Sequence, residues 1–426
     1  MTAAGGGDVV IVALGTRGDV APYTGLGVRL AEAGYTVSIA TQRPFAELVT
    51  GCGLRYREIP GDPRAILGSP AGRRTQGTGP RALAGTMRML REGLREIGDG
   101  MIAALRRDTD AALLSMSAIP FGYHIAEGLG IPSAGAVLVP IHATGDFPPP
   151  GLSRVPVPGR WGNRALARAG AAATQRLFRP HVARLRAELG LPRLGTRGLH
   201  REQEARRWPV LCGYSPTVLP RPRDWRDGVD VTGYWWPARP TGWQPPARLL
   251  DFLNAGPLPV CISLGSMATD GREGLAGLFA TALRRAGVRG IVQSGWADLA
   301  PDEHDDLLTI GEVPHDWLFP RMAAIVHHAG AGTTAAGLRA GVPAVGVPVW
   351  LDQPFWAARL VDLGVSPATI PLRRLTVDGL AAAIRAAVTG PAHRERARRL
   401  AARIAAEDGV GRVASALGNL CTRSSA

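Results

Sequence analysis

The chain has 426 residues, 46% of them hydrophobic, and a formal net charge of +14. This length exceeds that of a domain built on one ordinary hydrophobic core, so two domains of roughly 200 residues each are expected. The sequence contains no lysine, so every basic residue is arginine; a Walker-type phosphate loop and Schiff-base chemistry, which both require that amine, are excluded.

The arginines are spread over the whole chain. This distribution favours a coding bias over nucleic-acid binding, which concentrates positive charge on one patch or motif. A weaker alternative is attraction of an anionic acceptor or a membrane face to the arginines within residues 64–107. We therefore predict a protein with no nucleic-acid partner.

Neither a membrane span nor a disulfide framework is expected. No stretch approaches the roughly 20 apolar residues of a transmembrane helix, and the opening MTAAGGGDVVIVALG lacks a basic region before its short apolar run. We interpret this run as a first strand and the protein as cytoplasmic. The cysteines are far apart and form no CxxC pair, which predicts ordinary buried thiols and no structural zinc at Cys52, Cys212, Cys261 and Cys421.

The N-terminal part has the pattern of a βαβ unit. An apolar run at 9–14 leads into a glycine-rich turn at 15–19, a helical pattern at 22–33 and, after a glycine, a second apolar run at 36–40. Such a unit implies a parallel sheet with helices on its faces. Further buried strands are expected at 111–115 and 134–139, and the Gly-, Pro- and Arg-rich stretches 61–80 and 146–162 are expected to be surface loops lining an acceptor pocket.

The segment VTGYWWPARPTGWQPP, residues 231–246, has no periodic pattern and is the predicted interdomain linker. It divides the chain into an N-terminal domain at 1–230 and a C-terminal domain at 247–426, where the α/β pattern restarts. A final helix near 393–404 is expected on the surface of the second domain, with packing of the last helix back onto the first as the alternative. The expected strands of the second domain lie near 260–264, 290–293, 307–310, 323–327 and 344–348.

In open α/β sheets, ligands bind at the carboxyl ends of the strands. The segment IVHHAGAGTT, residues 325–334, runs from a buried strand through small residues into a helix. Small residues let an anion approach the backbone, and the N–H groups at a helix start favour negative charge, so a diphosphate site is predicted. His327 is expected to face away, because neighbouring strand residues point to opposite sides. The residues expected at the phosphates are His328, Gly330, Ala331, Gly332 and Thr333.

A second strand end, VPVWLDQP at residues 347–354, carries Asp352 and Gln353. Together they offer several hydrogen-bond donors and acceptors, which suits the hydroxyls of a sugar. The alternative is that they only cap the following helix. The short distance to the predicted diphosphate site favours sugar binding.

Two other strand ends are candidates for nucleotide contacts. Gly265 and Ser266 follow the strand at 260–264, where Ser266 either reaches the phosphates or ribose or belongs to an ordinary turn. Val313 follows the strand at 307–310 and offers its backbone to a nucleotide base. Trp296 is either a stacking partner for that base or a packing residue.

In the first domain, GTRGD at residues 15–19 follows the first strand and so lies at the cleft edge. A carboxylate at a helix start, such as Asp19, can serve as a general base if burial raises its pKa. The alternative is that Asp19 only caps the helix, and the residues alone leave this open. Asp108-Thr109-Asp110 has the spacing of a metal-binding pair, but it precedes a strand and so lies at the other end of the sheet, and no metal is predicted.

Together these segments resemble the inverting family 1 glycosyltransferases, in the branch of the glycopeptide-antibiotic and sterol glucosyltransferases. The likeness covers nearly the whole chain and is most specific in GTRGDVAPYTGLGVRLAEAGYTVSIAT at 15–41 and in VPHDWLFPRMAAIVHHAGAGTTAAGLRAGVPAVGVPVWLDQPFWAARLVDLGV at 313–365. The resemblance implies the GT-B fold, in which two Rossmann-like domains with parallel sheets face each other across a cleft. It also implies that the second domain holds most of the donor.

The resemblance implies roles for single residues as well. Asp19 becomes the base, Thr16 lies near the transferred group, and Asp352 and Gln353 hold the sugar. The diphosphate is held by His328, Gly330, Gly332 and Thr333 with help from Ser266.

The chain departs from the family at two positions. Ala329 replaces a glycine of the commoner HHGG, which is expected to cost little because alanine is small. Plant relatives place a glutamate on the ribose hydroxyls where this chain has Ala336, so UDP- and dTDP-sugars are both open as donors.

We therefore predict a metal-independent, inverting hexosyltransferase that needs no cofactor besides its nucleotide-sugar co-substrate. Its acceptor is expected to be a lipophilic small molecule, such as a natural-product aglycone or a sterol-like compound, and the protein a monomer or homodimer. One alternative is a nucleotide-sugar epimerase on the same scaffold. Another is a non-catalytic nucleotide-sugar-binding partner of a second transferase.

Overall fold

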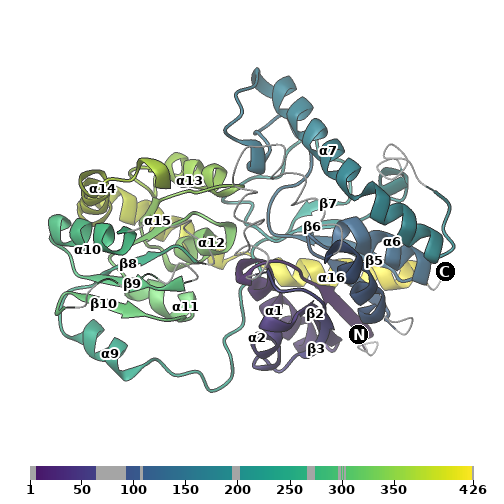
Figure 1. The fold of residues 1–426 in the computed structure, drawn as a ribbon, viewed down its shortest axis with the longest axis horizontal. Coiled ribbons are helices and arrows are strands. Elements are labelled where there is room, and N and C mark those ends of the chain that lie inside the picture. The colour runs from purple at the N-terminus through teal and green to yellow at the C-terminus, as the bar shows by residue number, and fades with distance from the viewer. Residues whose placement is uncertain are drawn as a thin grey trace.

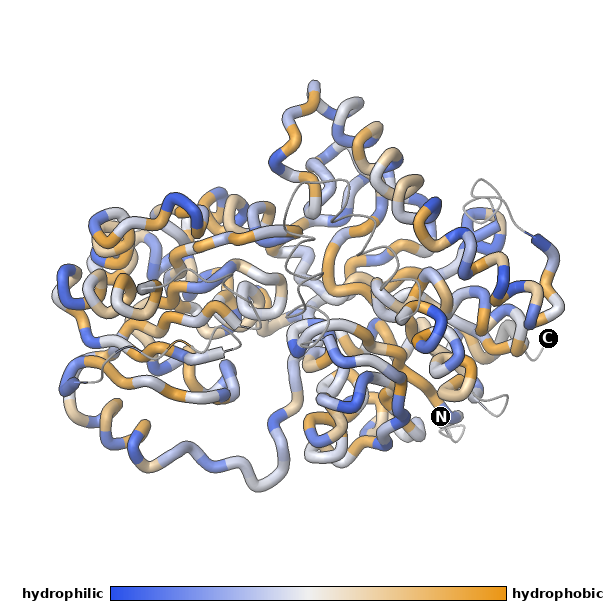
Figure 2. The backbone as a smooth tube through the Cα atoms, viewed as in Figure 1, coloured by the Kyte–Doolittle hydropathy of each residue, from blue (hydrophilic) through white to orange (hydrophobic). Residues whose placement is uncertain are grey.

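The computed structural model contains two parallel sheets, each covered by helices, as the sequence predicted (Figure 1). Hydrophobic segments run through the strands of both sheets (Figure 2). The buried apolar side chains form three clusters, one of which contains strand residues of both sheets, such as Val10 and Ile325. The structure describes residues 6–63, 93–105, 109–193, 202–265, 274–295, 299, 301 and 304–424.

The N-terminal domain is built on a seven-stranded sheet in the order β3-β2-β1-β4-β5-β6-β7. All of its neighbouring strands are parallel, so their carboxyl ends share one edge. The strands are β1 (Asp8–Val12), β2 (Thr36–Gln42), β3 (Arg55–Ile59), β4 (Ala111–Leu114), β5 (Ser133–Val137), β6 (Val210–Cys212) and β7 (Val229–Val231). The helices are α1 (Arg17–Glu32), η1 (Arg43–Phe45), α2 (Ala46–Thr50), α6 (Ile119–Leu129), η2 (Pro150–Leu152) and α7 (Gly159–Glu188).

The C-terminal domain is built on a five-stranded parallel sheet in the order β10-β9-β8-β11-β12. Its strands are β8 (Val260–Ser263), β9 (Gly290–Gln293), β10 (Leu307–Ile310), β11 (Ala324–His327) and β12 (Ala344–Gly346). The helices are α9 (Ala247–Asn254), α10 (Leu275–Ala286), α11 (His315–Leu318), η4 (Phe319–Arg321), α12 (Ala331–Ala340), α13 (Gln353–Asp362), η5 (Leu372–Arg374), α14 (Val377–Thr389), α15 (Pro391–Ala405) and α16 (Gly409–Ser424).

The first helix begins earlier than predicted. It starts at Arg17, not near position 22, because Thr16 serves as its N-cap and Asp19 closes a capping box three residues later. Pro22 therefore lies inside the helix, where it has no N–H to offer the carbonyl of Gly18. Asp19 thus belongs to the first helical turn and not to the turn before it.

The stretch at 146–162 is more ordered than a surface loop. It contains η2 and ends in the long helix α7, whose first half stands clear of the body of the molecule (Figure 1). Phe147 packs against Phe355 of α13, with ring centroids 5.5 Å apart, so this segment contacts the other domain. The part of the other predicted loop from residue 64 onward lies outside the described residues.

The segment that joins the domains packs first on the N-terminal one. Its Trp235 is buried against Tyr23, with ring centroids 5.7 Å apart. The backbone N–H of Ala238 then donates to Thr24 Oγ1 at 3.0 Å. Trp235 and the backbone of Ala238 therefore fix this part of the segment to α1, and it is not a free coil.

Farther along, the same segment contacts the C-terminal domain. Arg239 forms an ion pair with Asp316 at 2.6 Å, and Trp243 packs edge-on against Trp317 with centroids 5.6 Å apart. The two domains are thus linked by packed side chains as well as by the chain itself.

The prediction that the helix near 393–404 ends the chain was wrong. After α15 the chain forms α16, whose Val413 and Leu417 are buried in the same apolar cluster as Val9 and Leu30 of the N-terminal domain. Asp408 Oδ1 accepts a hydrogen bond from the Gly411 N–H at 2.8 Å and so marks the start of α16. The glycines at this start weaken the helical pattern in the sequence.

None of the four cysteines, all of which lie in the described ranges, forms a disulfide. Cys212 and Cys261 are buried, but Cys52 and Cys421 are only partly buried, so the prediction of buried thiols was wrong for these two. Cys52 lies in the turn after α2, and Cys421 lies near the end of α16, where the chain approaches the surface. Among the described helices, none has both the length and the hydropathy needed to cross a membrane.

Candidate active site

The turn after β1 carries the predicted base. Gly15 has a φ of 134°, and a Cβ added there would come within 2.5 Å of Asp19 Oδ2, so only glycine fits this position. The backbone N–H and the Oγ1 of Thr16 donate to the same Oδ2 at 2.8 and 2.9 Å. These contacts hold the Asp19 carboxylate at the start of α1, at the carboxyl edge of the sheet.

Burial raises the pKa of Asp19 above its ordinary value, and the two hydrogen bonds from Thr16 act in the opposite direction. Tyr23 lies one turn farther along α1, where its hydroxyl donates to the Ala136 carbonyl at 2.6 Å. Burial raises the pKa of Tyr23 well above its ordinary value, and the Asp19 charge adds to this shift. Asp19 therefore combines a fixed position with increased basicity, as a general base requires.

The strand β11 of the other domain leads directly into α12. Gly330 is the N-cap residue and provides no side chain to cap the helix. The first N–H groups of a helix have no partner within it, so those of Ala331, Gly332 and Thr333 point out of the helix start. Thr333 is almost fully buried there. The arrangement is that of an anion site.

Two histidines flank this helix start in different ways. His327 is buried, and its Nδ1 accepts a hydrogen bond from the Ala329 N–H at 3.1 Å, so it supports the turn. The ring of His328 fits between two glycines: a Cβ on Gly265 would come within 2.9 Å of its Cε1, and one on Gly330 within 2.4 Å of its Nε2. Burial lowers the pKa of His328 to about 4, so the ring is neutral at pH 7.

Ala329 destabilises the turn after β11 more than its small size suggested. Its φ is 62°, in the left-handed region where a Cβ is unfavourable by about 1 kcal/mol relative to glycine. The expectation of a negligible cost considered side-chain volume alone. The constraint at this position is the backbone conformation.

Asp352 and Gln353 begin α13, at the end of the turn that follows β12. Asp352 Oδ2 accepts a hydrogen bond from Trp356 Nε1 at 3.0 Å. Gln353 is buried, and its Oε1 accepts from the N–H groups of Val349 and Trp350 at 2.8 and 3.3 Å. Gln353 therefore holds the turn that presents Asp352.

The two halves of the site meet between the domains. A Cβ on Gly332 would lie 3.9 Å from the carbonyl oxygen of Gly18, so the starts of α12 and α1 face each other. Burial raises the pKa of Asp352 to about 6, and the negative charge of Asp19 adds to this shift. The sequence predicted that Asp19, the α12 start and Asp352 lie together, and the structure brings the three close to one another where the domains meet.

The outer end of the site is formed by the residues after β10. Val313 is buried there, next to His315. His315 stacks on Phe319 with centroids 4.3 Å apart, and burial lowers its pKa to about 4, with a contribution from the Arg17 charge. Sequence reasoning gave no role to His315 or Arg17. Their positions in the sequence, directly after β1 for Arg17 and after β10 for His315, could have identified them as candidates.

Comparisons with known proteins agree with this geometry. Residues 9–145 match the N-terminal domain of glycosyltransferase family 28, and residues 298–420 match the erythromycin biosynthesis protein CIII-like C-terminal domain. The chain is 36% identical over 407 residues to the O-mycaminosyltylonolide 6-deoxyallosyltransferase of Streptomyces fradiae, covering 94% of each chain. The chain therefore belongs to the glycosyltransferase family that includes this Streptomyces enzyme.

A sterol 3-beta-glucosyltransferase of Arabidopsis thaliana is 33% identical over 394 residues, and the match covers 88% of this chain and 60% of the plant enzyme. Among solved structures, the glycosyltransferase of kitacinnamycin superposes with a TM-score of 0.68 at 20% identity, over 97% of this chain and 99% of the other. The glycosyltransferase VinC in complex with DTDP gives 0.66 at 19% identity, over 98% of this chain and all of the other. These likenesses establish the GT-B fold, and none of these relatives is named as an epimerase.

Three residues considered for this glycosyltransferase from the sequence, Ser266, Trp296 and Asp108, lie outside the described residues. Asp110 is described, and its Oδ2 accepts a hydrogen bond from the N–H of Asp8, the first residue of β1, at 2.7 Å. It therefore lies at the amino end of the sheet, at the opposite end of β1 from Asp19. Within the described ranges, no group of three or more His, Cys, Asp or Glu side chains is arranged to hold a metal ion.

Proposed function

We propose that this glycosyltransferase moves a hexose from a UDP- or dTDP-sugar to a hydroxyl of a lipophilic small molecule, with inversion at the anomeric carbon. The observation that carries the proposal is the meeting of Asp19 with the uncapped start of α12 between the two domains. A base and an anion site on opposite walls suit a single displacement in which the acceptor and the leaving group lie on opposite sides of the sugar.

Asp19 takes the proton of the acceptor hydroxyl as the acceptor oxygen bonds to the anomeric carbon. The bond from that carbon to the diphosphate oxygen breaks, and its electron pair leaves with the diphosphate. Because burial raises the pKa of Asp19, the carboxylate is a stronger base than a solvated one. The hydrogen bonds from Thr16 keep it in place and put Thr16 beside the transferred group.

On the other wall, the N–H groups at Ala331, Gly332 and Thr333 receive the charge that grows on the diphosphate. Neutral His328 adds one ring N–H, and Gly265 and Gly330 leave room for its ring. Asp352 accepts hydrogen bonds from sugar hydroxyls, and Gln353 supports the turn that presents it.

For the nucleotide, the proposal assigns the base to the backbone at Val313 and a phosphate or ribose contact to Ser266. The VinC structure is a complex with DTDP, which favours a nucleoside diphosphate donor for this chain as well. UDP- and dTDP-sugars both remain candidates. Transfer without a metal or other cofactor is part of the proposal, and unchanged turnover in EDTA would support it.

Exposed apolar side chains near the proposed site favour a lipophilic acceptor. Met116 and Ile141 follow the carboxyl ends of β4 and β5 and remain 44% and 36% exposed. Leu351, next to Asp352 on the other wall, is 55% exposed. Exposed apolar side chains at a cleft edge gain free energy when an apolar acceptor covers them. The names of the macrolide and sterol relatives are consistent with this class.

The test is transfer by Asp19→Asn with UDP- and dTDP-glucose and a panel of hydrophobic acceptors, followed by mass spectrometry. We expect turnover to fall by at least roughly a thousandfold while nucleotide affinity stays within about threefold. Asp110→Asn is the matched control, because this carboxylate bonds to the backbone at the far end of the same sheet. Normal turnover in Asp19→Asn would remove Asp19 from the mechanism.

A further inference from the structure

Among the described residues of the C-terminal domain, the histidines at the proposed diphosphate site bring no full positive charge. Burial lowers the pKa of His315 and His328 to about 4 and that of His327 to about 3, so all three rings are neutral at pH 7. The start of α12 contributes only a partial charge of about one half. The chain has no lysine. A side chain that brings a full positive charge to the leaving group must therefore be an arginine.

Arg17 is the arginine that the fold places opposite this wall. It is the first residue of α1, between Thr16, which holds the base, and Gly18, whose carbonyl oxygen faces Gly332. Burial lowers the pKa of His315, and the positive charge of Arg17 lowers it further. The electrostatic effect of Arg17 therefore reaches a residue of the C-terminal domain beside the site. Arg17 therefore lies beside the site from the N-terminal side.

In this structure the guanidinium of Arg17 forms an ion pair with Glu312 at 3.1 Å, which links the two domains. Both side chains are well exposed, at 40% and 57%. Exposed ion pairs contribute little to stability, because water solvates the separated charges well. Glu312 directly precedes Val313, the residue assigned to the nucleotide base, so the pair lies at the entrance to the donor site.

We propose that Arg17 is a ligand of the donor diphosphate, and that it exchanges Glu312 for the phosphate oxygens when the donor binds. A guanidinium binds a phosphate through two parallel hydrogen bonds, which are stronger than a solvated pair with a carboxylate. The exchange brings a full positive charge to the leaving group from the same helix turn that carries the base. This inference rests on the proposed function.

The experiment compares the affinity of nucleoside diphosphates (UDP and dTDP) with that of the nucleosides (uridine and thymidine) by calorimetry. Arg17→Gln is expected to weaken diphosphate binding by roughly 10- to 100-fold and nucleoside binding by less than about twofold. Glu312→Gln is expected to bind diphosphate as tightly as the unmodified chain or more tightly, because it removes the competing carboxylate. Arg17→Lys is expected to restore part of the loss.

Arg239→Gln is the matched control, because Arg239 also forms an exposed ion pair between the domains, with Asp316 at 2.6 Å. Its diphosphate affinity is expected to stay within about twofold of the unmodified chain. Equal losses in Arg17→Gln and Glu312→Gln would show that the pair only holds the domains together and would overturn the proposal. An Arg17→Gln variant with full affinity would overturn it too. An unmodified chain that binds neither UDP nor dTDP would instead overturn the proposed function itself.

Discussion

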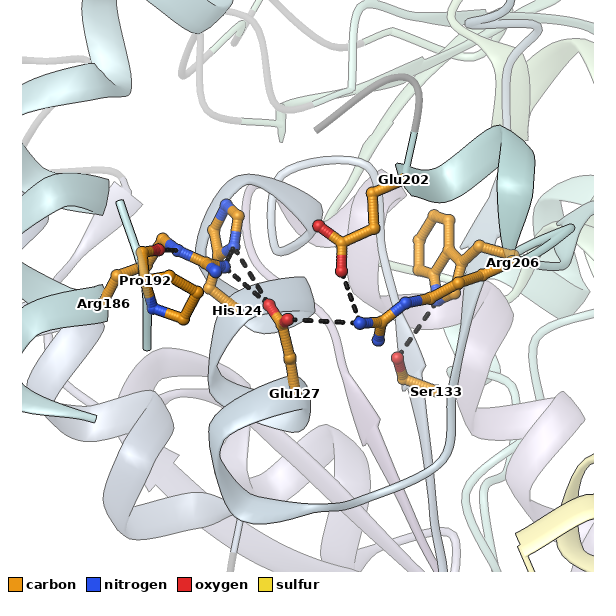
Figure 3. Close-up of polar contacts among 8 residues, drawn as sticks. His124, Glu127, Ser133, Arg186, Pro192, Glu202 and Arg206 are labelled. Atoms are coloured by element: carbon orange, nitrogen blue, oxygen red, sulfur yellow. Dashed lines mark hydrogen bonds and ion pairs between the residues drawn. The ribbon is translucent and has the colours of Figure 1, made fainter. Parts of the chain in front are cut away.

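Two clusters of charged and polar side chains in this protein are organised in opposite ways. The first lies inside the N-terminal domain and joins α6 to the end of α7 (Figure 3). Arg186 is 1% exposed and donates to Glu127 Oε2 at 2.6 Å, to His124 Nδ1 at 2.9 Å and to the Pro192 carbonyl at 2.7 Å. Arg206 adds a second positive charge to Glu127 at 3.5 Å. Each charge here has a partner of opposite sign.

The second cluster lies where the domains meet. Asp19 and Asp352 accept hydrogen bonds there, but neither carboxylate takes part in an ion pair between described residues. Burial raises the pKa of Asp352, and the like charge of Asp19 raises it further. The Nδ1 of His328 is buried without a hydrogen-bond partner within the described residues. Ala329 adds a strained backbone. Compensated charges stabilise a fold, whereas uncompensated groups around a cleft are poised to bind a ligand, so the contrast separates a structural network from a functional site.

The largest effect is expected from breaking the structural network. Arg186→Met leaves Glu127 without its closest partner and is expected to lower the free energy of unfolding by about 3–5 kcal/mol. Chemical denaturation measures the loss, and the folded fraction should keep its turnover. The control is Arg29→Met, which removes an exposed pair with Glu32 and should cost less than about 0.5 kcal/mol. A loss in Arg186→Met as small as this control would contradict the structural role.

Next comes a change at the anion site. His328→Ala removes the ring N–H assigned to the diphosphate and is expected to weaken UDP and dTDP binding by roughly 10- to 100-fold, with little change in stability. Calorimetry measures the affinity. His393→Ala is the control, since its Nδ1 contacts the Gly364 carbonyl in the C-terminal domain. Equal affinities in the two variants would count against the phosphate assignment.

A smaller effect is expected at Asp352, where the substitution should raise the free energy of unfolding and not lower it. Burial raises the pKa of Asp352 to about 6 in the folded chain, above its ordinary 3.8, so the ionised carboxylate destabilises the fold at pH above 6. Asp352→Asn should therefore raise the free energy of unfolding at pH 7.5 by roughly 1–2 kcal/mol while it impairs transfer. The difference should shrink as the pH falls through about 6, because the native carboxyl is then neutral. A difference independent of pH would show that this carboxylate is not under strain.

The smallest effect concerns the backbone. Ala329→Gly relieves the positive φ and is expected to stabilise the chain by about 1 kcal/mol. Ala172→Gly, at an exposed position inside α7, should destabilise by roughly 0.5–1 kcal/mol, since glycine is unfavourable in a helix. Thermal unfolding of both variants measures the sign. A destabilised Ala329→Gly variant would mean that the lost methyl packing outweighs the strain.

Much of the fold followed from the sequence, because buried parallel strands are short apolar runs with clear ends. The strands at 290–293 and 307–310 have the predicted bounds. The helices α7 and α16 were missed for two different reasons. The pattern of α7 is obscured by its exposure on most sides, and that of α16 by glycines at its start. Pattern reasoning works best where one face is buried.

The site was predictable to the extent that strand ends share one edge of a sheet. That rule predicted that Asp19, His328 and Asp352 lie near one another, at the strand ends where the domains meet. It gave no information on contacts between domains, so the pair of Arg17 with Glu312 was missed. It also gave no backbone angle, so the strain at Ala329 was missed.

The most direct test of the whole account is an experimental structure of the chain with UDP or dTDP bound. The account predicts the diphosphate on the N–H groups at the start of α12, within hydrogen-bond distance of His328, with its terminal phosphate facing the Asp19 carboxylate. A nucleotide bound elsewhere, away from both Asp19 and His328, would contradict it.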